Sequence, residues 1–305
     1  MLIPARRDAL RPILTTLGAI LLSSAIGQAA SQEMAAGPAL WTLQDEDTTI
    51  HLFGLPGFVS EQTVWRTARL DTVFDDADLV VFEADRTSED AQTAMQAAVV
   101  EQGLLRDGRS LADTVDAALY ERVEVAADAL GLPLQAIRPL KPWLVSVQLG
   151  AFNLQQQGWT VAPPPAAVIA QTARQTGAEL RYLEQPGELL GRMARLPDEV
   201  HAGMLEQAVL TLETRPEEPA GIVAAWSRGD VEALADLYHG PGAWADERLR
   251  QTMLVERNAA WTDAVSDMMA AETGIVLVAV GAGHLVGEDS LIRGLEARGY
   301  TVTRR

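Results

Sequence analysis

The sequence contains no cysteine, only four histidines and few aromatic residues, and its acidic side chains far outnumber the basic ones. Without cysteine the chain forms no disulfide and carries no lipid on a thiol, so its stability must come from burial. It has 24 lysines and arginines against 42 aspartates and glutamates, a net charge of −18. Such a chain repels nucleic acid and anionic membrane surfaces, so neither is an expected partner.

Several common motifs are also missing from the sequence. It contains no glycine-rich phosphate loop, no serine-nucleophile elbow and no His-Glu-x-x-His zinc helix. After the N-terminal region, no uncharged run reaches the roughly 20 apolar residues that a membrane span needs. We therefore expect no membrane span once the N-terminal segment is removed.

The N-terminal segment has the layout of a secretory signal peptide. Arg6, Arg7 and Arg11 precede an uncharged run over residues 13–26, and small residues follow at 27–30. The alternative is an uncleaved anchor, for which the run is short. We expect residues 1–30 to be cleaved and the protein to be periplasmic or secreted, with a charge two units more negative than −18.

The remaining chain alternates strand and helix patterns. We predict a flexible lead-in over 31–38 and a single domain over 39–305. Strands are expected at 39–43, 48–53, 79–82, 180–183, 275–280 and 300–303, and helical segments at 59–75, 88–157, 166–174, 187–271 and 288–298. This alternation predicts an α/β fold with a mixed or mostly parallel central sheet flanked by helices. The two longest helical segments are longer than a crossover between two parallel strands needs. They predict an extra helical layer above one edge of the sheet.

Polar or flexible residues follow four of the predicted strands, and ligands of open α/β sheets bind beyond the carboxyl ends of strands. The segments at these ends are Gly54-Leu55-Pro56-Gly57, Glu83 with Asp85, Glu184, and Gly281-Ala282-Gly283-His284. Three of the four contain a metal ligand or an acid/base group. Acidic residues also follow strands for turn reasons alone, so this signal has a structural alternative.

Each candidate residue has such an alternative. His284 is either a ligand or proton carrier, or a histidine that caps a helix or fills the core. Glu83 and Glu184 are either partly desolvated ligands or bases, or plain strand ends. Three further residues, Glu256, Arg257 and Asn258, form a polar triplet that alone would pass as helix surface. The pattern around the other histidines indicates packing for His51 and surface positions for His201 and His239.

The segments ALWTLQDEDTTIHLFG, LVVFEAD, ELRYLE, VERNAAW and VAVGAGHLVGEDSLIRGLEARGYTV, in this order, resemble the TraB/GumN family. This family is related to the TIKI peptidases and, more distantly, to the erythromycin esterase and ChaN-like folds. The resemblance implies a mixed α/β fold and, in active relatives, metal-dependent peptide hydrolysis. It assigns His284, Glu83 and Glu184 as ligands of a divalent metal such as zinc, manganese or cobalt. It assigns catalytic roles to Glu83, Glu256, Arg257 and Asn258, with Glu83 or Glu256 as the base.

The chain departs from the family pattern at two places. Relatives typically read Gly-Thr-Ile-His where this sequence reads Gly54-Leu55-Pro56-Gly57, so a histidine ligand is replaced by glycine. His51 lies about 20 Å from Gly57 in an extended segment and does not replace it. Relatives also carry an aspartate after the position of Trp159, where this chain has Thr160-Val161-Ala162-Pro163.

Two functions follow from the resemblance. One is an exported protein whose degenerate hydrolase site, with or without a metal, binds a peptide, an envelope component or a partner protein. The other is an active metal-dependent peptidase. The missing ligand favours the first, because loss of one metal ligand costs orders of magnitude in affinity or rate.

Overall fold

The computed structural model describes residues 37–106, 108–160 and 164–305. The predicted signal peptide over 1–30 lies outside the described residues, as do positions 31–36 of the predicted lead-in and positions 161–163. In the described part of the chain, no helix combines the length and the apolar character that a bilayer span needs.

A six-stranded sheet forms the centre of the fold, with strand order β4-β3-β5-β2-β1-β6. The four neighbours β4, β3, β5 and β2 are parallel, and β1 pairs antiparallel with both β2 and β6. The strands are β1 (Leu40–Gln44), β2 (Thr48–Leu55), β3 (Leu79–Ala84), β4 (Glu179–Glu184), β5 (Gly274–Gly281) and β6 (Thr303–Arg304). The predicted mostly parallel sheet flanked by helices is thus confirmed.

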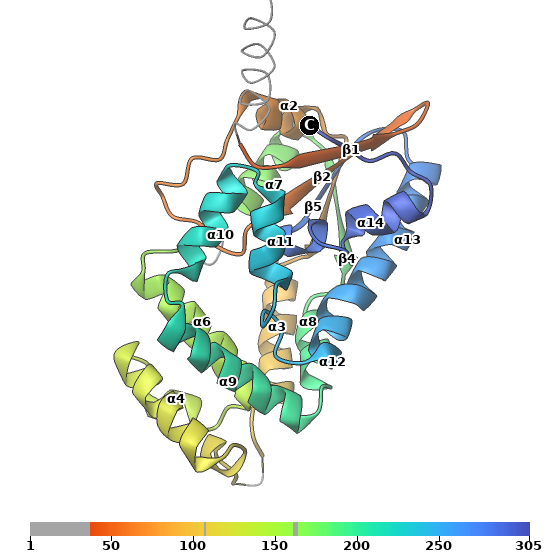
Figure 1. Cartoon of the computed structure of the whole chain (residues 1–305). Helices are drawn as coiled ribbons and strands as arrows, with labels where there is room; N and C mark the ends of the chain where they lie inside the picture. The colour runs from red at the N-terminus through yellow and green to blue at the C-terminus, as the bar shows by residue number, and fades with distance from the viewer. Residues whose placement is uncertain (1–36, 107, 161–163) are drawn as a thin grey trace, which may run out of the picture. The chain divides into compact units, whose positions relative to one another are not determined.

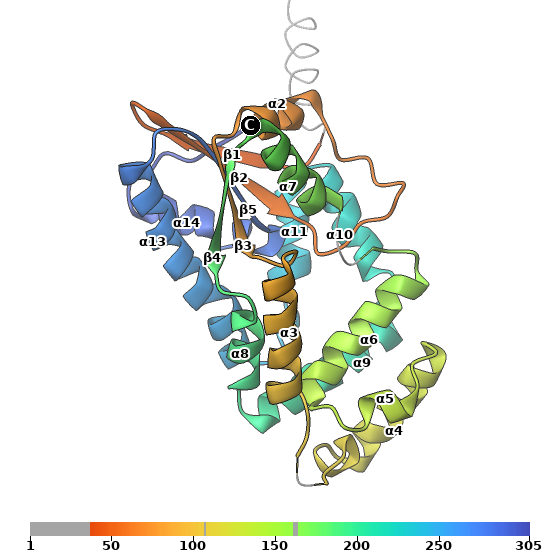
Figure 2. The ribbon, with the colours of Figure 1, turned by 180° about the vertical axis from the view of Figure 1, so that it is seen from behind.

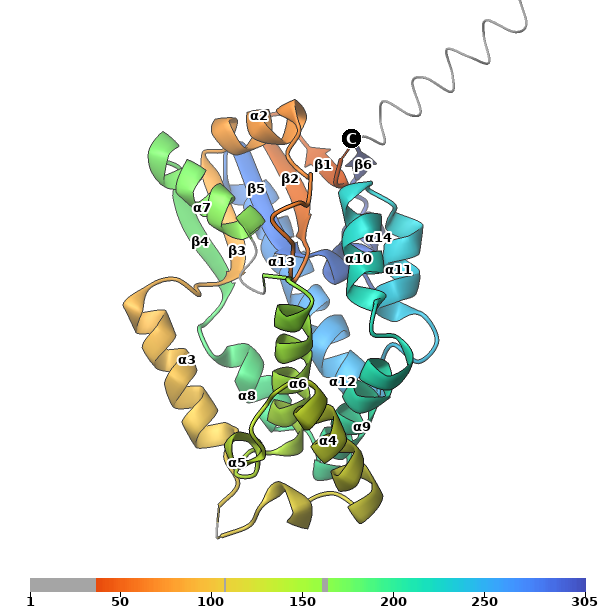
Figure 3. The same ribbon diagram turned by 90° about the vertical axis from the view of Figure 1, so that its left-hand side faces the viewer.

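Helices cover both faces of the sheet. Figure 3 shows α7 in front of the sheet, α2 across its top and α13 behind it. On the α2 face, Phe53 of β2 packs edge-on against Phe74, with ring centroids 5.6 Å apart, and α10 adds Trp226 at 6.3 Å. These helices are α2 (Ala68–Asp76), α7 (Pro164–Thr176), α10 (Glu218–Ser227), α11 (Val231–His239), α13 (Glu256–Ala271) and α14 (Leu291–Ala297).

The predicted extra helical layer exists, and the edge above which it lies is the one formed by the carboxyl ends of the parallel strands (Figures 1 and 2). It contains α3 (Glu89–Gln102), α4 (Ala117–Ala129), α5 (Leu134–Ile137), α6 (Pro142–Gln156), α8 (Glu188–Ala194) and α9 (Asp198–Thr214). The reason is directional: β3 leads into α3 and β4 into α8, so the chain leaves the sheet along the strands. Side chains such as Val123, Leu149 and Leu205 form a separate apolar core there.

Three predicted boundaries differ from the structure by three residues or more, and two of these differences follow from local capping. Helix α2 begins at Ala68 rather than at 59, because the Thr67 side chain accepts the N–H of Leu70. In the same way, the Ser290 side chain accepts the N–H of Arg293, and α14 begins at Leu291 rather than at 288. The last strand covers only 303–304, where the partner strand β1 offers two paired positions.

Candidate functional site

Four parallel strands end side by side at one edge of the sheet. In spatial order these ends contribute Glu184 from β4, Glu83 from β3, Gly281 from β5 and Leu55 from β2. Parallel pairing in register places the equivalent ends of neighbouring strands next to each other. The four segments singled out from the sequence therefore meet at one edge.

Arg257 of α13 binds the side chains that extend from these strand ends. Its Nε donates to Glu184 Oε1 at 2.8 Å and its Nη2 to Glu184 Oε2 at 3.1 Å. Nη2 also donates to Glu83 Oε2 at 3.0 Å, and Nη1 donates to His284 Nε2 at 3.0 Å. The main-chain carbonyl of Met253 accepts from Nη1 at 3.3 Å. A guanidinium has five N–H groups, and all five have partners here.

The Arg257 side chain is buried at 4% exposure, and the Glu184 side chain at 5%. The guanidinium carbon lies 4.5 Å from the centroid of the Trp261 ring, a cation–π contact from the next turn of the same helix. Burial alone would lower the pKa of Arg257, but hydrogen bonds and charge from Glu184 and Glu83 raise it. The charge is therefore held firmly in place by two carboxylates and one aromatic face.

His284 is held in one neutral tautomer. Because Arg257 donates to Nε2, the ring proton resides on Nδ1, which donates to Asn258 Oδ1 at 2.7 Å. Asn258 Nδ2 in turn donates to the carbonyl of Asp289 at 2.7 Å, which fixes the orientation of the amide. Burial lowers the pKa of His284 to about 4, opposed by Glu83 and assisted by Arg257. At neutral pH the imidazole is therefore uncharged.

Glu83 bridges Arg257 and the backbone of the strand next to its own. Its Oε1 accepts the N–H of Gly281 at 2.6 Å, while Oε2 accepts from Arg257. A Cβ at position 281 would lie 3.0 Å from Oε1, so glycine permits this close approach. Burial would raise the pKa of Glu83, but His284, Arg257 and the Gly281 N–H together lower it. Glu83 is thus an ionised carboxylate rather than a proton donor.

A π-helical turn over Gln251–Val255 joins α12 (Glu247–Arg250) to α13 just before the polar triplet. A single π turn inserts an extra residue into the helical repeat and commonly marks a functional site. Here it precedes the turn in which Arg257 and Asn258 are buried, at 4% and 3% exposure, while Glu256 is not. The carbonyl of Met253 within this turn is one of the five acceptors of Arg257.

A cavity of about 600 Å³ adjoins this network and lies in the size range of small-ligand sites. Its wall combines the ends of β2, β3 and β5 with α7, the end of α11 and the π turn, and Glu83 and His284 belong to it. Most of the lining is apolar, including Leu55, Phe82, Ala170, Met253 and Leu254. Tyr238 also lines it, and burial raises the pKa of this phenol to about 12, so it is uncharged.

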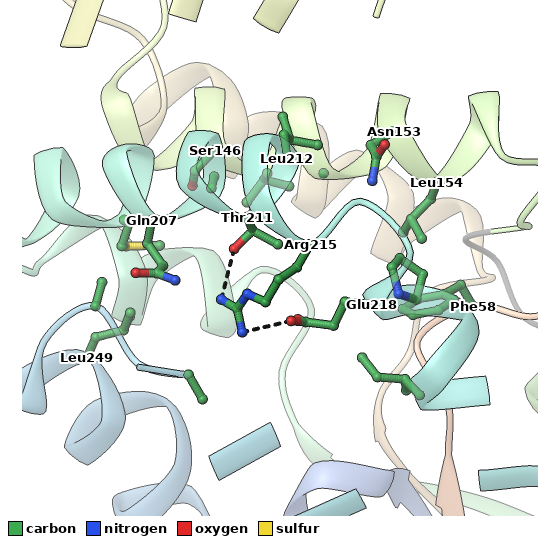
Figure 4. A pocket seen from close by; sticks show the side chains of 18 residues that line it. Phe58, Ser146, Asn153, Leu154, Gln207, Thr211, Leu212, Arg215, Glu218 and Leu249 are labelled. Carbon is green, nitrogen blue, oxygen red and sulfur yellow. Dashed lines mark hydrogen bonds and ion pairs between the residues drawn. The ribbon is translucent and has the colours of Figure 1, made fainter. Parts of the chain in front are cut away.

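A second, more open hollow of about 380 Å³ lies between α6, α9 and α10 (Figure 4). We call it the helical groove. Arg215 lies in it and pairs with Glu218 at 2.8 Å, while Leu154 and Leu212 are among its apolar lining residues. Phe58 lines both this groove and the cavity, so the two hollows meet at that ring.

Five of the six residues assigned from the resemblance lie in one connected network: Glu83, Glu184, Arg257, Asn258 and His284. The exception is Glu256, whose side chain is 50% exposed and lies 3.8 Å from Arg192. It is not among the residues that line the cavity, because it is the outward member of the triplet.

The structure also places Asp85 and the three other histidines of the sequence. His51 packs in its strand, and its Nδ1 lies 2.9 Å from the hydroxyl of Thr42. Asp85 serves a turn, since its Oδ1 accepts the N–H groups of Thr87 and Ser88. The surface positions expected for two histidines were wrong. His201 is 2% exposed beneath α8, and His239 lines the cavity, because α9 and α11 turn these residues inward.

The residues present do not fit a divalent metal in this arrangement. Both carboxylates and the Nε2 lone pair of His284 are directed at Arg257, a fixed cation that would repel a metal ion. Position 57 is a glycine on the cavity wall and offers no ligand. Among the described residues, no group of three histidine or carboxylate side chains has the spacing for a metal ion.

Sequence reasoning missed several residues of the site. Trp261 had a usable signal, because it lies one helical turn after Arg257 on the same face of α13. Phe58, Tyr238, His239 and Trp244 had none. They reach the cavity through the path of loops and the packing of α11, which no local pattern encodes.

The fold and the site define a mixed α/β protein with an arginine-centred polar network at the carboxyl ends of its parallel strands. The model of the TraB/PrgY/gumN family matches residues 39–304, and the chain belongs to this family. A search of curated proteins and a search of solved structures found no match.

Proposed function

We propose that this chain is an exported peptide-binding protein that keeps the fold of its family but has an altered, metal-free site. The ligand is a peptide chain, either free or part of an envelope protein. One observation carries the proposal: Arg257 directs four of its five N–H groups at Glu83, Glu184 and His284, and the fifth at the carbonyl of Met253. A hydrolase would need those groups to hold an ion or activate water.

The cavity beside the network supports binding rather than chemistry. It is large enough for part of a peptide, and its wall is mostly apolar with a few polar groups, as in ligand-binding pockets generally. Glu83 is already bound by Arg257 and the Gly281 N–H, so it is poorly placed to take a proton from water. The network therefore serves as a rigid polar floor for the cavity.

The test uses the chain without residues 1–30. Calorimetry with Zn²⁺, Mn²⁺ and Co²⁺ should show no uptake at micromolar ion, and an array of blocked pentapeptides should show binding without cleavage. Stoichiometric metal uptake that disappears in His284→Ala, together with peptide cleavage, would instead establish the metal-dependent peptidase. An array without a single binding peptide would refute the peptide-binding proposal.

A gain-of-ligand variant checks whether Arg257 excludes a metal. A Cβ at Gly57 would meet nothing within 4 Å, so Gly57→His introduces an imidazole on the cavity wall without a clash at Cβ. Because Arg257 still holds both carboxylates and His284 Nε2, this variant should gain no zinc binding over wild type. Stoichiometric zinc uptake by the variant would mean that Arg257 yields these groups to an ion, and it would contradict the metal-free proposal.

A further inference from the structure

The sheet has one long edge strand. Strand β4 lies at the end of the strand order, and its only partner in the described sheet is β3. The opposite edge is formed by β6, whose two residues are too few to template another strand. Figure 2 shows β4 between α7 and α13, with no described helix across it. The six residues of β4 are therefore the edge that is available to an added strand.

The register shows which main-chain groups of β4 are unpaired. The N–H of Glu179 donates at 2.9 Å to the carbonyl of Asp78, directly before β3, so Glu179 faces β3. Successive residues of a strand direct their N–H and C=O groups alternately to its two sides, so Arg181 also faces β3. Leu180 and Tyr182 face the free edge, and no described residue pairs with their main-chain groups there. The edge thus offers two N–H and two C=O groups.

Tyr182 joins this edge to the cavity. It is 38% exposed, and it also lines the cavity together with Phe82 of β3 and Arg174 of α7. A residue that pairs opposite Tyr182 directs its side chain to the same face of the sheet, so that side chain lies beside the cavity. In strand addition generally, main-chain hydrogen bonds give affinity and pockets for alternate side chains give specificity. Both features are present at β4.

We propose that an extended peptide pairs with β4 as a seventh strand and places one apolar side chain in the cavity beside Tyr182. The N–H groups of Leu180 and Tyr182 donate to peptide carbonyls, and their own carbonyls accept peptide N–H groups. This inference rests on the proposed peptide-binding function and names the surface that recognises the main chain. Main-chain pairing tolerates many side chains, while the mostly apolar cavity wall selects the residue beside Tyr182.

A second copy of this chain is a poorer occupant of the same edge. Two antiparallel β4 strands that pair over all six residues would place Glu179 opposite Glu184, and like charges directly opposite each other are destabilising. Each copy also carries a net charge of −18, so two copies repel each other. An uncharged peptide avoids both costs.

The first experiment needs no protein variant. The probe is the tightest-binding pentapeptide of the blocked array, N-methylated at each position in turn and measured by calorimetry. Methylation removes one donor, so positions that pair with β4 should lose about tenfold in affinity. The positions between them should change little, because only alternate residues of a strand face its neighbour. A uniform response along the peptide would overturn the inference.

Amide hydrogen exchange, followed by NMR on the chain without residues 1–30, tests the same contact from the protein side. Saturation with the pentapeptide should slow exchange of the Leu180 and Tyr182 N–H groups at least tenfold. The N–H of Arg181 is the internal control and should slow far less, because it already faces β3. Equal slowing of all three would reflect general stabilisation by a ligand bound elsewhere and would contradict pairing at this edge.

Two variants of one residue separate the main chain from the side chain. Tyr182→Val and Tyr182→Pro both remove the phenol, but only proline removes the outward N–H, which an edge strand tolerates. With circular dichroism confirming that both are folded, Tyr182→Pro should bind the pentapeptide at least fivefold more weakly than Tyr182→Val. Equal affinities would count against the pairing.

The remaining outcomes distinguish this inference from the proposed function. Failure of every peptide in the array would remove the proposed function as well, whereas peptide binding without alternation along the probe removes only the pairing with β4. Sedimentation of the peptide-free chain should show a monomer at micromolar concentration. A stable dimer that is lost in Tyr182→Pro would assign the edge to a second copy and overturn the inference.

Discussion

Arg257 shows how the meaning of a residue depends on its neighbours. The sequence places it in a polar triplet on a helix, which by itself indicates a solvated surface. In the fold it is 4% exposed and bound by two carboxylates from two different strands. A buried ion pair of this kind contributes little beyond a well-packed apolar core, but breaking it leaves an uncompensated charge.

Removal of this guanidinium should therefore be strongly destabilising. Arg257→Met leaves Glu83 and Glu184 buried without a cation, and we expect a loss of about 3–5 kcal/mol in the free energy of unfolding. Urea denaturation followed by circular dichroism measures it. Arg181→Met is the matched control: this arginine also contacts two carboxylates, Glu179 and Glu272, but is 40% exposed. Its replacement should cost no more than about 1 kcal/mol, and equal losses would mean that burial is not the cause.

His284 makes stability depend on pH in a predictable direction. Its pKa is about 4 in the folded protein, against 6.5 for an ordinary histidine. The unfolded chain therefore binds a proton first as pH falls, and the free energy of unfolding decreases below pH 6.5 until about pH 4. Above pH 6.5 this contribution is constant. Because one pKa unit corresponds to about 1.4 kcal/mol, the loss from pH 7 to pH 5 should be about 2 kcal/mol.

The measurement is urea denaturation of wild type and His284→Gln at pH 7, 6 and 5. Burial also lowers the pKa of His51 and His201, so both proteins should lose stability in the same direction. The variant should lose about 2 kcal/mol less than wild type over this range. If the free energy of unfolding fell equally with pH in the two proteins, His284 would not be the buried neutral histidine described above.

At the scale of elements, the sequence was most informative where backbone pairing decides the outcome. Continuous apolar runs predicted the buried parallel strands, and parallel pairing then brings their ends together. This is why Glu83, Glu184 and His284 could be placed at one edge from sequence alone. Which edge of the sheet carries the helical layer could not be predicted, because this depends on the direction in which the chain leaves β3 and β4 rather than on any helix's own pattern.

The packing of α14 on α13 gives a prediction at this scale. A Cβ at Gly294 would lie 2.5 Å from the hydroxyl of Thr262. Thr262 is 3% exposed and donates to the carbonyl of Asn258 at 2.6 Å, so it has little freedom to move. Gly294→Ala should therefore cost about 1–3 kcal/mol in the free energy of unfolding, although alanine favours helices.

Gly203 of α9 is the natural control, since a Cβ there would meet nothing within 4 Å. Gly203→Ala should raise the free energy of unfolding by up to about 1 kcal/mol through helix propensity alone. Denaturation of both variants under the same conditions gives the comparison. A stabilised Gly294→Ala variant would show that the two helices are less closely packed than described.

At the scale of the whole molecule, net charge can be calculated from the sequence because it needs no knowledge of the fold. The chain carries −18 at pH 7, and repulsion among its acidic groups opposes the compact state. Many of its ion pairs lie at the surface, such as Arg248 with Glu199 at 49% and 67% exposure, and contribute little individually. We therefore expect charge repulsion to lower the free energy of unfolding by more than the surface ion pairs raise it.

Added salt should then stabilise the protein at neutral pH. Raising NaCl from 10 to 150 mM shortens the screening length from about 30 to 8 Å, which weakens repulsion between distant carboxylates. We expect the melting temperature at pH 7 to rise by about 2–4 °C, measured by calorimetry. Near the isoelectric pH of about 4.6 the net charge vanishes, and the same change in salt should give no rise. A fall at pH 7 would mean that the surface ion pairs outweigh the repulsion.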